Sequence, residues 1–302
     1  MSVFSTPRGI VTRSLEGSPG VRSRKRRGAI VSWIYVAATA SAVLALAVLL
    51  WTIWDRGASS LDLSFITSKS SSRAERAGIG TALLGTLWII TLTALIAIPL
   101  GVGAAVYLEE YAPRNWWTRI LQTNISNLAG VPSVVYGLLG LGVFANILAL
   151  GRTIITGALT MSLLVLPIIV IAGQESIRAV PLSLRQGAYA LGATKWQVTR
   201  YHVLPVAMPG ILTGTILALS RAIGETAPLL VAGASGYLTF NPDSIMDGYT
   251  VLPVQIFYWT SRPQDEFREL AAAGIIVLMI ILLMMNSVAI VFRHRFGKRA
   301  RW

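Results

Sequence analysis

Long apolar stretches separated by short polar segments dominate the pattern along this chain. A helix needs about 20 residues to cross about 30 Å of hydrocarbon at about 1.5 Å per residue. Six stretches meet this requirement, so the pattern predicts an all-α integral membrane protein with six transmembrane helices. We place them at residues 29–54, 79–108, 120–150, 153–177, 203–231 and 270–292.

Composition agrees with a membrane setting. Hydrophobic residues make up 54% of the chain and charged residues only 13%, whereas soluble domains carry about 25% charged residues. The first apolar stretch follows basic residues and contains ATASA, which resembles a signal-peptide cleavage site. It is nevertheless about twice as long as a signal core of about 7–15 residues, so we interpret it as an uncleaved anchor.

The distribution of charge predicts the orientation, because short segments rich in Lys and Arg stay in the cytoplasm. Placing both termini inside assigns four segments to the cytoplasm: 1–28, 109–119, 174–202 and 293–302. They hold 18 of the 26 Lys and Arg residues but only 4 of the 13 Asp and Glu residues. We therefore expect a multi-pass protein of the plasma (inner) membrane with both termini cytoplasmic.

This orientation divides the chain into four parts. We expect a basic cytoplasmic tail (1–28), a first transmembrane helix with an external loop (29–77), a transmembrane core of five helices (78–292) and a second basic tail (293–302). The basic runs RSRKRR and RHRFGKRAR lie beside membrane spans, so we interpret them as topology signals and contacts for anionic lipid. A nucleic-acid-binding arm is the alternative, but no binding module accompanies them, so we expect no nucleic-acid partner.

Several chemistries are excluded or disfavoured by the residues. The chain has no cysteine, and its histidines, His202 and His294, have no carboxylate at metal-ligand spacing. It contains no GxxxxGK[ST] sequence. We therefore expect it to bind neither a metal ion nor ATP.

The fifth apolar stretch carries the ionisable residues Arg221 and Glu225. Arg at the centre of a transmembrane helix costs about 2.5–3.5 kcal/mol, so such residues indicate a functional site by default. Their spacing of four predicts that they share one helix face. Thr226 adds a hydroxyl donor, and Pro228 with Gly224 can provide a bend. The alternative is an ion pair that only neutralises itself within the bundle.

The long polar segment between the fourth and fifth stretches contains helix start and stop signals. We predict a short helix after Pro181, a break at Gly192 and a second helix with Thr194 as its N-cap. Two short helices joined at a glycine make a compact knob below the membrane. Taken alone, the segment favours an ordinary amphipathic interfacial hairpin.

The spacing of this segment resembles the EAA motif of ABC-importer permeases: Glu-Ala-Ala, three residues, Gly, nine residues, Ile, one residue, Leu-Pro. Here Gln, Gly and His replace the Glu, the second-position Ala and the Ile of that motif. The EAA-like loop spans residues 181–205, and the resemblance implies that it docks on an ATPase. The implied coupling residues are Gln186, Gly187, Ala188, Gly192, Ala193, Thr194, Leu204 and Pro205.

A narrower resemblance covers residues 78–292. The stretches that carry it are IPLGVGAAVYLEEYA (98–112), AGVPSVVYGLLGLGVF (129–144), RAIGETAPLL (221–230) and VLPVQIFYW (251–259). They are similar to PstA-type permease subunits of phosphate ABC importers. The resemblance implies a type I importer fold with cytoplasmic coupling helices.

The same resemblance implies the partners and the function. They are a second, PstC-like permease, a PstB-like ATPase dimer that binds ATP and Mg, a PstS-like external phosphate-binding protein, and inorganic phosphate. The chain itself is then a non-catalytic subunit with no cofactor of its own. Arg221, Glu225 and Thr226 are the expected substrate-path residues, with Glu225 orienting the guanidinium or accepting a proton from hydrogen phosphate.

Three other functions stay open at this point. A permease for molybdate, sulfate or phosphonate would share the loop, and a non-transporting scaffold would tolerate loss of the intramembrane charges. A membrane enzyme would need a convergent nucleophile and base, which the sequence does not offer. Weaker site candidates have structural alternatives. Ser133 and Tyr136 are candidates for the substrate path, and Glu109, Glu110 and Arg114 are candidates at a helix end. Arg178 and Glu175 are a candidate ion pair, and the external loop 232–269 is a candidate docking surface.

Overall fold

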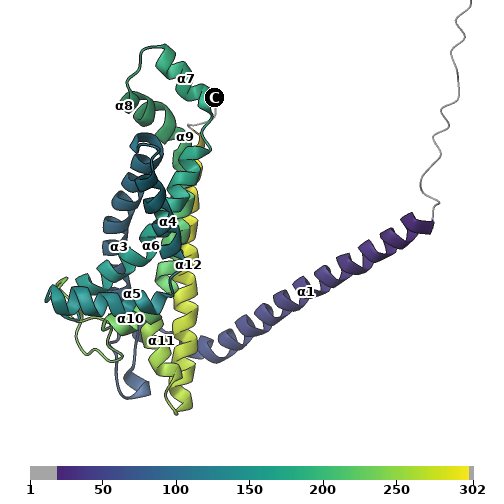
Figure 1. The fold of residues 1–302 in the computed structure, drawn as a ribbon. Coiled ribbons are helices and arrows are strands. Elements are labelled where there is room, and N and C mark those ends of the chain that lie inside the picture. Colours follow the sequence, from purple (N-terminus) through teal and green to yellow (C-terminus); the bar gives the residue numbers. More distant parts are fainter. Residues whose placement is uncertain (1–18, 299–302) are drawn as a thin grey trace, which may run out of the picture. The chain divides into compact units, whose positions relative to one another are not determined.

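The computed structural model describes residues 19–298, and all secondary structure in that range is helical (Figure 1). Five helical segments are long and apolar enough to cross a membrane. They contain α1 (Pro19–Gly57), α3 (Gly80–Val106), α6 (Ile154–Arg178), α9 (Leu204–Gly224) and α12 (Asp265–Lys298). The predicted all-α membrane class is confirmed. Parts of both predicted basic tails lie outside the described residues.

The chain separates into two compact units, residues 1–52 and 53–302. In the first unit, α1 is exposed throughout its apolar stretch, and side chains such as Trp33 and Trp51 are about 70% exposed. A helix that is apolar on all sides faces lipid or other helices. The last residues of α1 belong to the second unit, where the backbone of Gly57 lies directly against Ala272 and Ala273 of α12.

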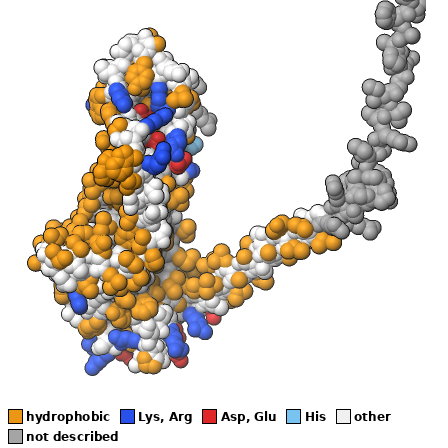
Figure 2. Space-filling view, in the orientation of Figure 1, with side chains coloured by type: hydrophobic (Ala, Val, Ile, Leu, Met, Phe, Trp, Pro, Cys, Tyr) orange, Lys and Arg blue, Asp and Glu red, His pale blue; other side chains and the backbone are white. Residues whose placement is uncertain are grey.

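Helix α6 is the central helix of the second unit. Two thirds of its most apolar segment is buried, compared with about a third for the α9 segment. Small residues lie at the crossings: Gly101 of α3 contacts Ile169, and Gly214 of α9 contacts Ala172. Hydrophobic side chains cover the middle of the unit, and charged ones gather toward its two ends (Figure 2).

Shorter elements connect the long helices. They are η2 (Ala58–Ser60), α2 (Leu63–Thr67), η3 (Ala74–Arg76), η4 (Tyr107–Tyr111), α4 (Trp116–Ala129), α5 (Ser133–Leu139), η5 (Gly140–Ile147), α7 (Leu182–Ala190), α8 (Lys195–Val198), η6 (Thr199–Val203), α10 (Ala227–Ala232) and α11 (Leu252–Thr260).

The third predicted span, 120–150, is not one straight helix. Helix α4 ends at Ala129, and the next helical segment, which begins at Ser133, is bent from it by 106°. Pro132 explains the break, because proline has no N–H for the helix ladder and forces the preceding residue into an extended conformation. The described residues therefore contain five straight spans, and a sixth only if this bent pair is counted as one.

Close backbone contact between α3 and the loop before α11 makes a prediction about stability. A Cβ at Gly85 would lie 1.9 Å from the carbonyl oxygen of Thr250, whereas one at Gly103 of the same helix would meet nothing within 4 Å. We expect Gly85→Ala to destabilise the protein by about 1–3 kcal/mol, as overpacking does.

The matched variant Gly103→Ala should not lower stability, because alanine is the better helix former. Thermal unfolding of the two purified variants in detergent measures the difference. Equal apparent Tm values for both would contradict the close contact.

Candidate functional site

The predicted fifth span breaks at the position of its charged residues. Helix α9 ends at Gly224, Glu225 is extended (φ −83°, ψ 118°), and α10 begins at Ala227. Pro228 causes the break, since its ring would clash with the carbonyl of Gly224 and it lacks the N–H that would bond there. The bend that the sequence suggested at Gly224 and Pro228 is thus present.

This break changes the expected relation between Arg221 and Glu225. The two do not share a helix face, because Glu225 lies beyond the helical end of α9. Their side chains still approach, with 3.9 Å between Arg221 Nε and Glu225 Oε2. The arginine side chain is 52% exposed and the glutamate 20%, so the pair does not neutralise itself in a buried interior. Thr226, partly buried, follows at the first residue before α10.

Arg221 lies on a face of α9 that the described residues of the second unit leave uncovered. Leu217, one turn earlier, is 64% exposed, and Gly224, one turn later, is also exposed and has no neighbour near its Cβ position. Further round the helix, Ala218 and Ala222 are buried. An arginine on an apolar, uncovered face of a membrane helix indicates a functional site.

Tyr136 packs in the core. It is only 6% exposed, and its hydroxyl donates to the carbonyl of Leu128 at 2.8 Å. This bond connects α5 to the end of α4 across the bend. The structure therefore favours the packing role of Tyr136 over a role on a substrate path.

The predicted knob is present, and we call residues 181–200 the coupling knob. Helix α7 follows Pro181, and the chain reverses at Gly192, whose φ of +82° favours glycine. Thr194 then caps α8: its side chain accepts from the backbone N–H of Gln197, and the Gln197 side chain accepts from the backbone N–H of Thr194.

The second helix of the knob is not a separate element. Helix α8, the π-helical turn η6 and α9 run on as one helix from Lys195 to Gly224. Leu204 and Pro205, which were grouped with the coupling loop, lie within this continuous helix. The wider π turn directly before Pro205 accommodates a residue without an N–H.

The predicted coupling residues are divided between the surface and the core of the knob. Gln186, Gly187, Gly192 and Thr194 are exposed, whereas Ala188 is buried against Val198 and the end of α6. Large hydrophobic side chains stand out beside the exposed residues. They are Leu182, Tyr189, Leu191 and Trp196, with Leu191 90% exposed. An exposed apolar patch of this kind marks an interaction surface.

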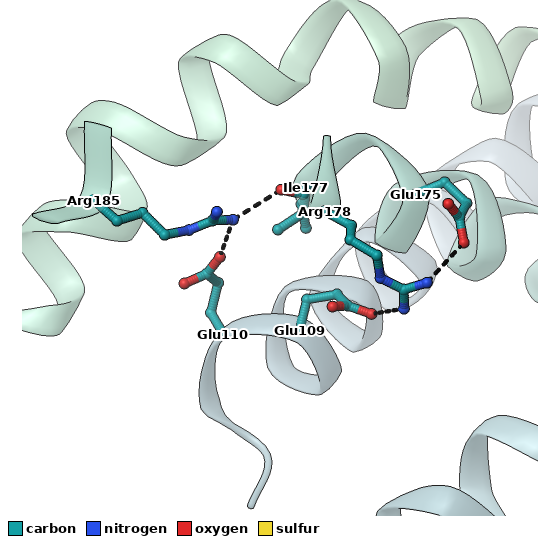
Figure 3. Close-up of polar contacts among 6 residues, drawn as sticks. All are labelled: Glu109, Glu110, Glu175, Ile177, Arg178 and Arg185. Atoms are coloured by element: carbon teal, nitrogen blue, oxygen red, sulfur yellow. Dashed lines mark hydrogen bonds and ion pairs between the residues drawn. The ribbon is translucent and has the colours of Figure 1, made fainter. Parts of the chain in front are cut away.

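A salt bridge ties the knob to the transmembrane helices. Arg185 of α7 donates to Glu110 of η4 at 2.9 Å and to the carbonyls of Val180 and Ile177 at 2.8 Å (Figure 3). The side chains of the pair are only 16% and 8% exposed. Arg185 thus adds a charged donor to one carbonyl in the last turn of α6 and to one just beyond it.

A second ion-pair group lies beside it. Arg178 binds Glu175, as its spacing of three predicts, and also Glu109 of η4 (Figure 3). Sequence reasoning missed Arg185, because its partner Glu110 is 75 residues away and no local pattern connects the two.

Comparison with known proteins identifies the class. Residues 97–302 match the family model of the binding-protein-dependent transport system inner membrane component, so the chain belongs to that family of multi-pass permease components. The resemblance to PstA-type permeases is confirmed. The phosphate transport system permease protein PstA 1 of Mycobacterium tuberculosis is 35% identical over 74% of this chain and 72% of its own length.

Other relatives and solved structures agree. The probable ABC transporter permease protein YqgI of Bacillus subtilis is 37% identical, covering 77% of this chain and 83% of its own. PstA of Yersinia pestis is 31% identical over 80% and 83%. A bacterial alginate ABC transporter chain shares the fold, with a TM-score of 0.66, 15% identity and coverage of 90% and 98%.

The Arg185 bridge predicts a measurable change in the mobility of the knob. Arg185→Met removes hydrogen bonds to a charged group, each worth about 1.5–3 kcal/mol, so local opening should become at least about tenfold more frequent. Hydrogen–deuterium exchange of residues 182–198 measures this opening.

The control is Arg200→Met, since Arg200 is exposed, lies over the rings of Trp196 and Tyr201, and forms no ion pair with the described residues. Its exchange should match that of the unmodified protein. If Arg185→Met also left exchange unchanged, the bridge would not hold the knob.

Proposed function

We propose that this chain is the membrane-spanning permease subunit of an ATP-driven importer for inorganic phosphate. The observation that carries the proposal is a guanidinium, Arg221, on an uncovered apolar helix face in a chain closely similar to phosphate transport permeases. Guanidinium binds a tetrahedral oxyanion through two parallel hydrogen bonds, which lysine cannot provide. ATP hydrolysis belongs to a separate ATPase.

A second permease completes the path. One half-exposed arginine is insufficient to hold a multiply charged anion, so a PstC-like subunit packed on the α9 face would contribute further donors. Glu225, 3.9 Å from Arg221, orients the guanidinium and accepts a hydrogen bond from the protonated oxygen of hydrogen phosphate. Thr226 supplies a hydroxyl donor. This arrangement disfavours fully deprotonated sulfate, because sulfate has no proton to donate to the Glu225 carboxylate and its oxygens would be repelled by that carboxylate.

The coupling knob carries the motion of the ATPase. A PstB-like ATPase dimer docks on its exposed patch, and closure of the dimer on ATP moves the knob. Arg185 fixes α7 to η4 and to the end of α6, and α8 continues into α9. The displacement of the knob therefore reaches α9, the helix that carries Arg221. The permease then changes between inward-facing and outward-facing states.

The orientation follows from the charge distribution. The knob and both termini, including the tail 1–28, face the cytoplasm. Residues 232–269, at the opposite end of the core, face outward and receive a PstS-like phosphate-binding protein. Released phosphate would then meet Arg221 first, since the α9–α10 break lies toward that side.

The central prediction concerns Arg221→Gln. Replacing the guanidinium by a neutral amide removes charged hydrogen bonds worth about 1.5–3 kcal/mol, so ATP-driven phosphate uptake should fall about 10- to 100-fold. Uptake into proteoliposomes that contain the full complex measures this, with sulfate and molybdate as competitors.

Arg76→Gln is the control, because Arg76 is also an exposed arginine but lies outside both the α9–α10 break and the proposed docking loop 232–269. It should retain uptake. Full uptake by Arg221→Gln would make the Arg221–Glu225 pair structural, and uptake of another oxyanion in place of phosphate would contradict the assigned substrate.

The docking surface is tested at Gly187. A Cβ at this exposed position would have no neighbour within 4 Å, so we expect neither Gly187→Ala nor Gly187→Trp to disturb the fold. The indole should block the ATPase sterically. We expect Gly187→Trp to lose co-purification with the ATPase and Gly187→Ala to keep it; retention by both would place the docking surface elsewhere.

A further inference from the structure

A cavity of about 340 Å³ opens where η4, the start of α4 and the end of α6 meet. Its size is within the range of about 300–1,000 Å³ that holds small ligands. Three arginines line it: Arg114, Arg119 and Arg178. Arg178 is four residues before the start of α7, so the cavity lies beside the coupling knob and away from the α9–α10 break.

The positive charge of this cavity is only partly compensated. Glu109 and Glu175 both bind Arg178. Within the described residues, Arg114 and Arg119 make no ion pair and no side-chain hydrogen bond. Gln122, one turn after Arg119, adds an amide donor to the lining. The free donors therefore favour an anion, and the only carboxylate in the lining, Glu109, is already engaged by Arg178.

The surroundings place the cavity at an interface between lipid and water. Trp116 and Trp117 follow directly on the lining residue Asn115, their rings stack 4.3 Å apart, and both are about 60% exposed. Exposed tryptophans of this kind concentrate at the level of lipid headgroups. The positive end of the α4 helix dipole also points into this region.

We propose that this cavity binds a phosphate group, held by the guanidinium groups of Arg114 and Arg119 and the amide of Gln122. Paired guanidinium groups match the planar pairs of oxygens on a tetrahedral phosphate. A phosphate group at this level has two sources, the headgroup of an anionic lipid or inorganic phosphate. The site is separate from Arg221, so it stands whether or not the transported ion is phosphate.

The test is direct binding to the purified full-length chain in the Arg221→Gln background, which removes the other arginine proposed to bind phosphate. One arm titrates phosphatidylglycerol by native mass spectrometry. The other measures radiolabelled inorganic phosphate in nanodiscs of phosphatidylcholine. Each arm compares Arg114→Gln/Arg119→Gln with Arg73→Gln/Arg76→Gln, a pair that removes the same charge from exposed positions outside this cavity.

We expect the Arg114/Arg119 double variant to bind at least about tenfold more weakly in one arm, as the loss of charged hydrogen bonds predicts, while the control pair keeps full affinity. The arm that responds identifies the source. Full binding by both double variants in both arms would overturn the proposal. Equal weakening of both double variants would overturn it too, because it would mean that the phosphate group is attracted by net charge alone. No transport is measured, so the result is independent of the uptake experiments.

Discussion

Close backbone contact around α6 is the constraint on which the rest of this structure depends. Lipid tails are as apolar as leucine, so membrane helices associate through packing rather than through exclusion of water. Glycines at the crossings let α3 and α9 approach α6 until side chains touch backbone, as Gly101 and Gly214 do. Helices α6 and α12 pack against α9. The face of α9 that carries Arg221 is the face that they leave uncovered.

Two prolines determine where this packed core is interrupted. Pro132 separates α4 from α5, and Pro228 separates α9 from α10. The broken ends meet, because Gly137 of α5 lies directly against Pro228 and Val231. The break between α9 and α10, next to Arg221, thus packs against α5, the helix that follows the break at Pro132. Backbone groups freed by a proline are tolerated at membrane depth only where protein or a water-filled cavity surrounds them.

The sequence predicted the parts of this molecule that follow from local rules. Apolar length predicted the membrane helices, and the break at Gly192 and the N-cap at Thr194 were both apparent from residue type. The break at Pro132 was missed, and the break at Pro228 was expected only as a bend, because proline inside a membrane helix is sometimes accommodated. Arg185 was missed because its role depends on Glu110, which only the tertiary fold brings near. The exposure of Arg221 likewise depends on which face α6 and α12 cover.

In the proposed function, positive charge at position 221 serves the passage of phosphate. The absence of cysteine from this chain allows a direct measurement. Arg221→Cys, in a complex whose other subunits lack reactive cysteine, is assayed for phosphate uptake before and after modification with positively or negatively charged methanethiosulfonate reagents. We predict that uptake is lost on substitution, restored in part only by the positive reagent, and that phosphate slows the modification. Equal recovery with both reagents, or no loss on substitution, would contradict the account.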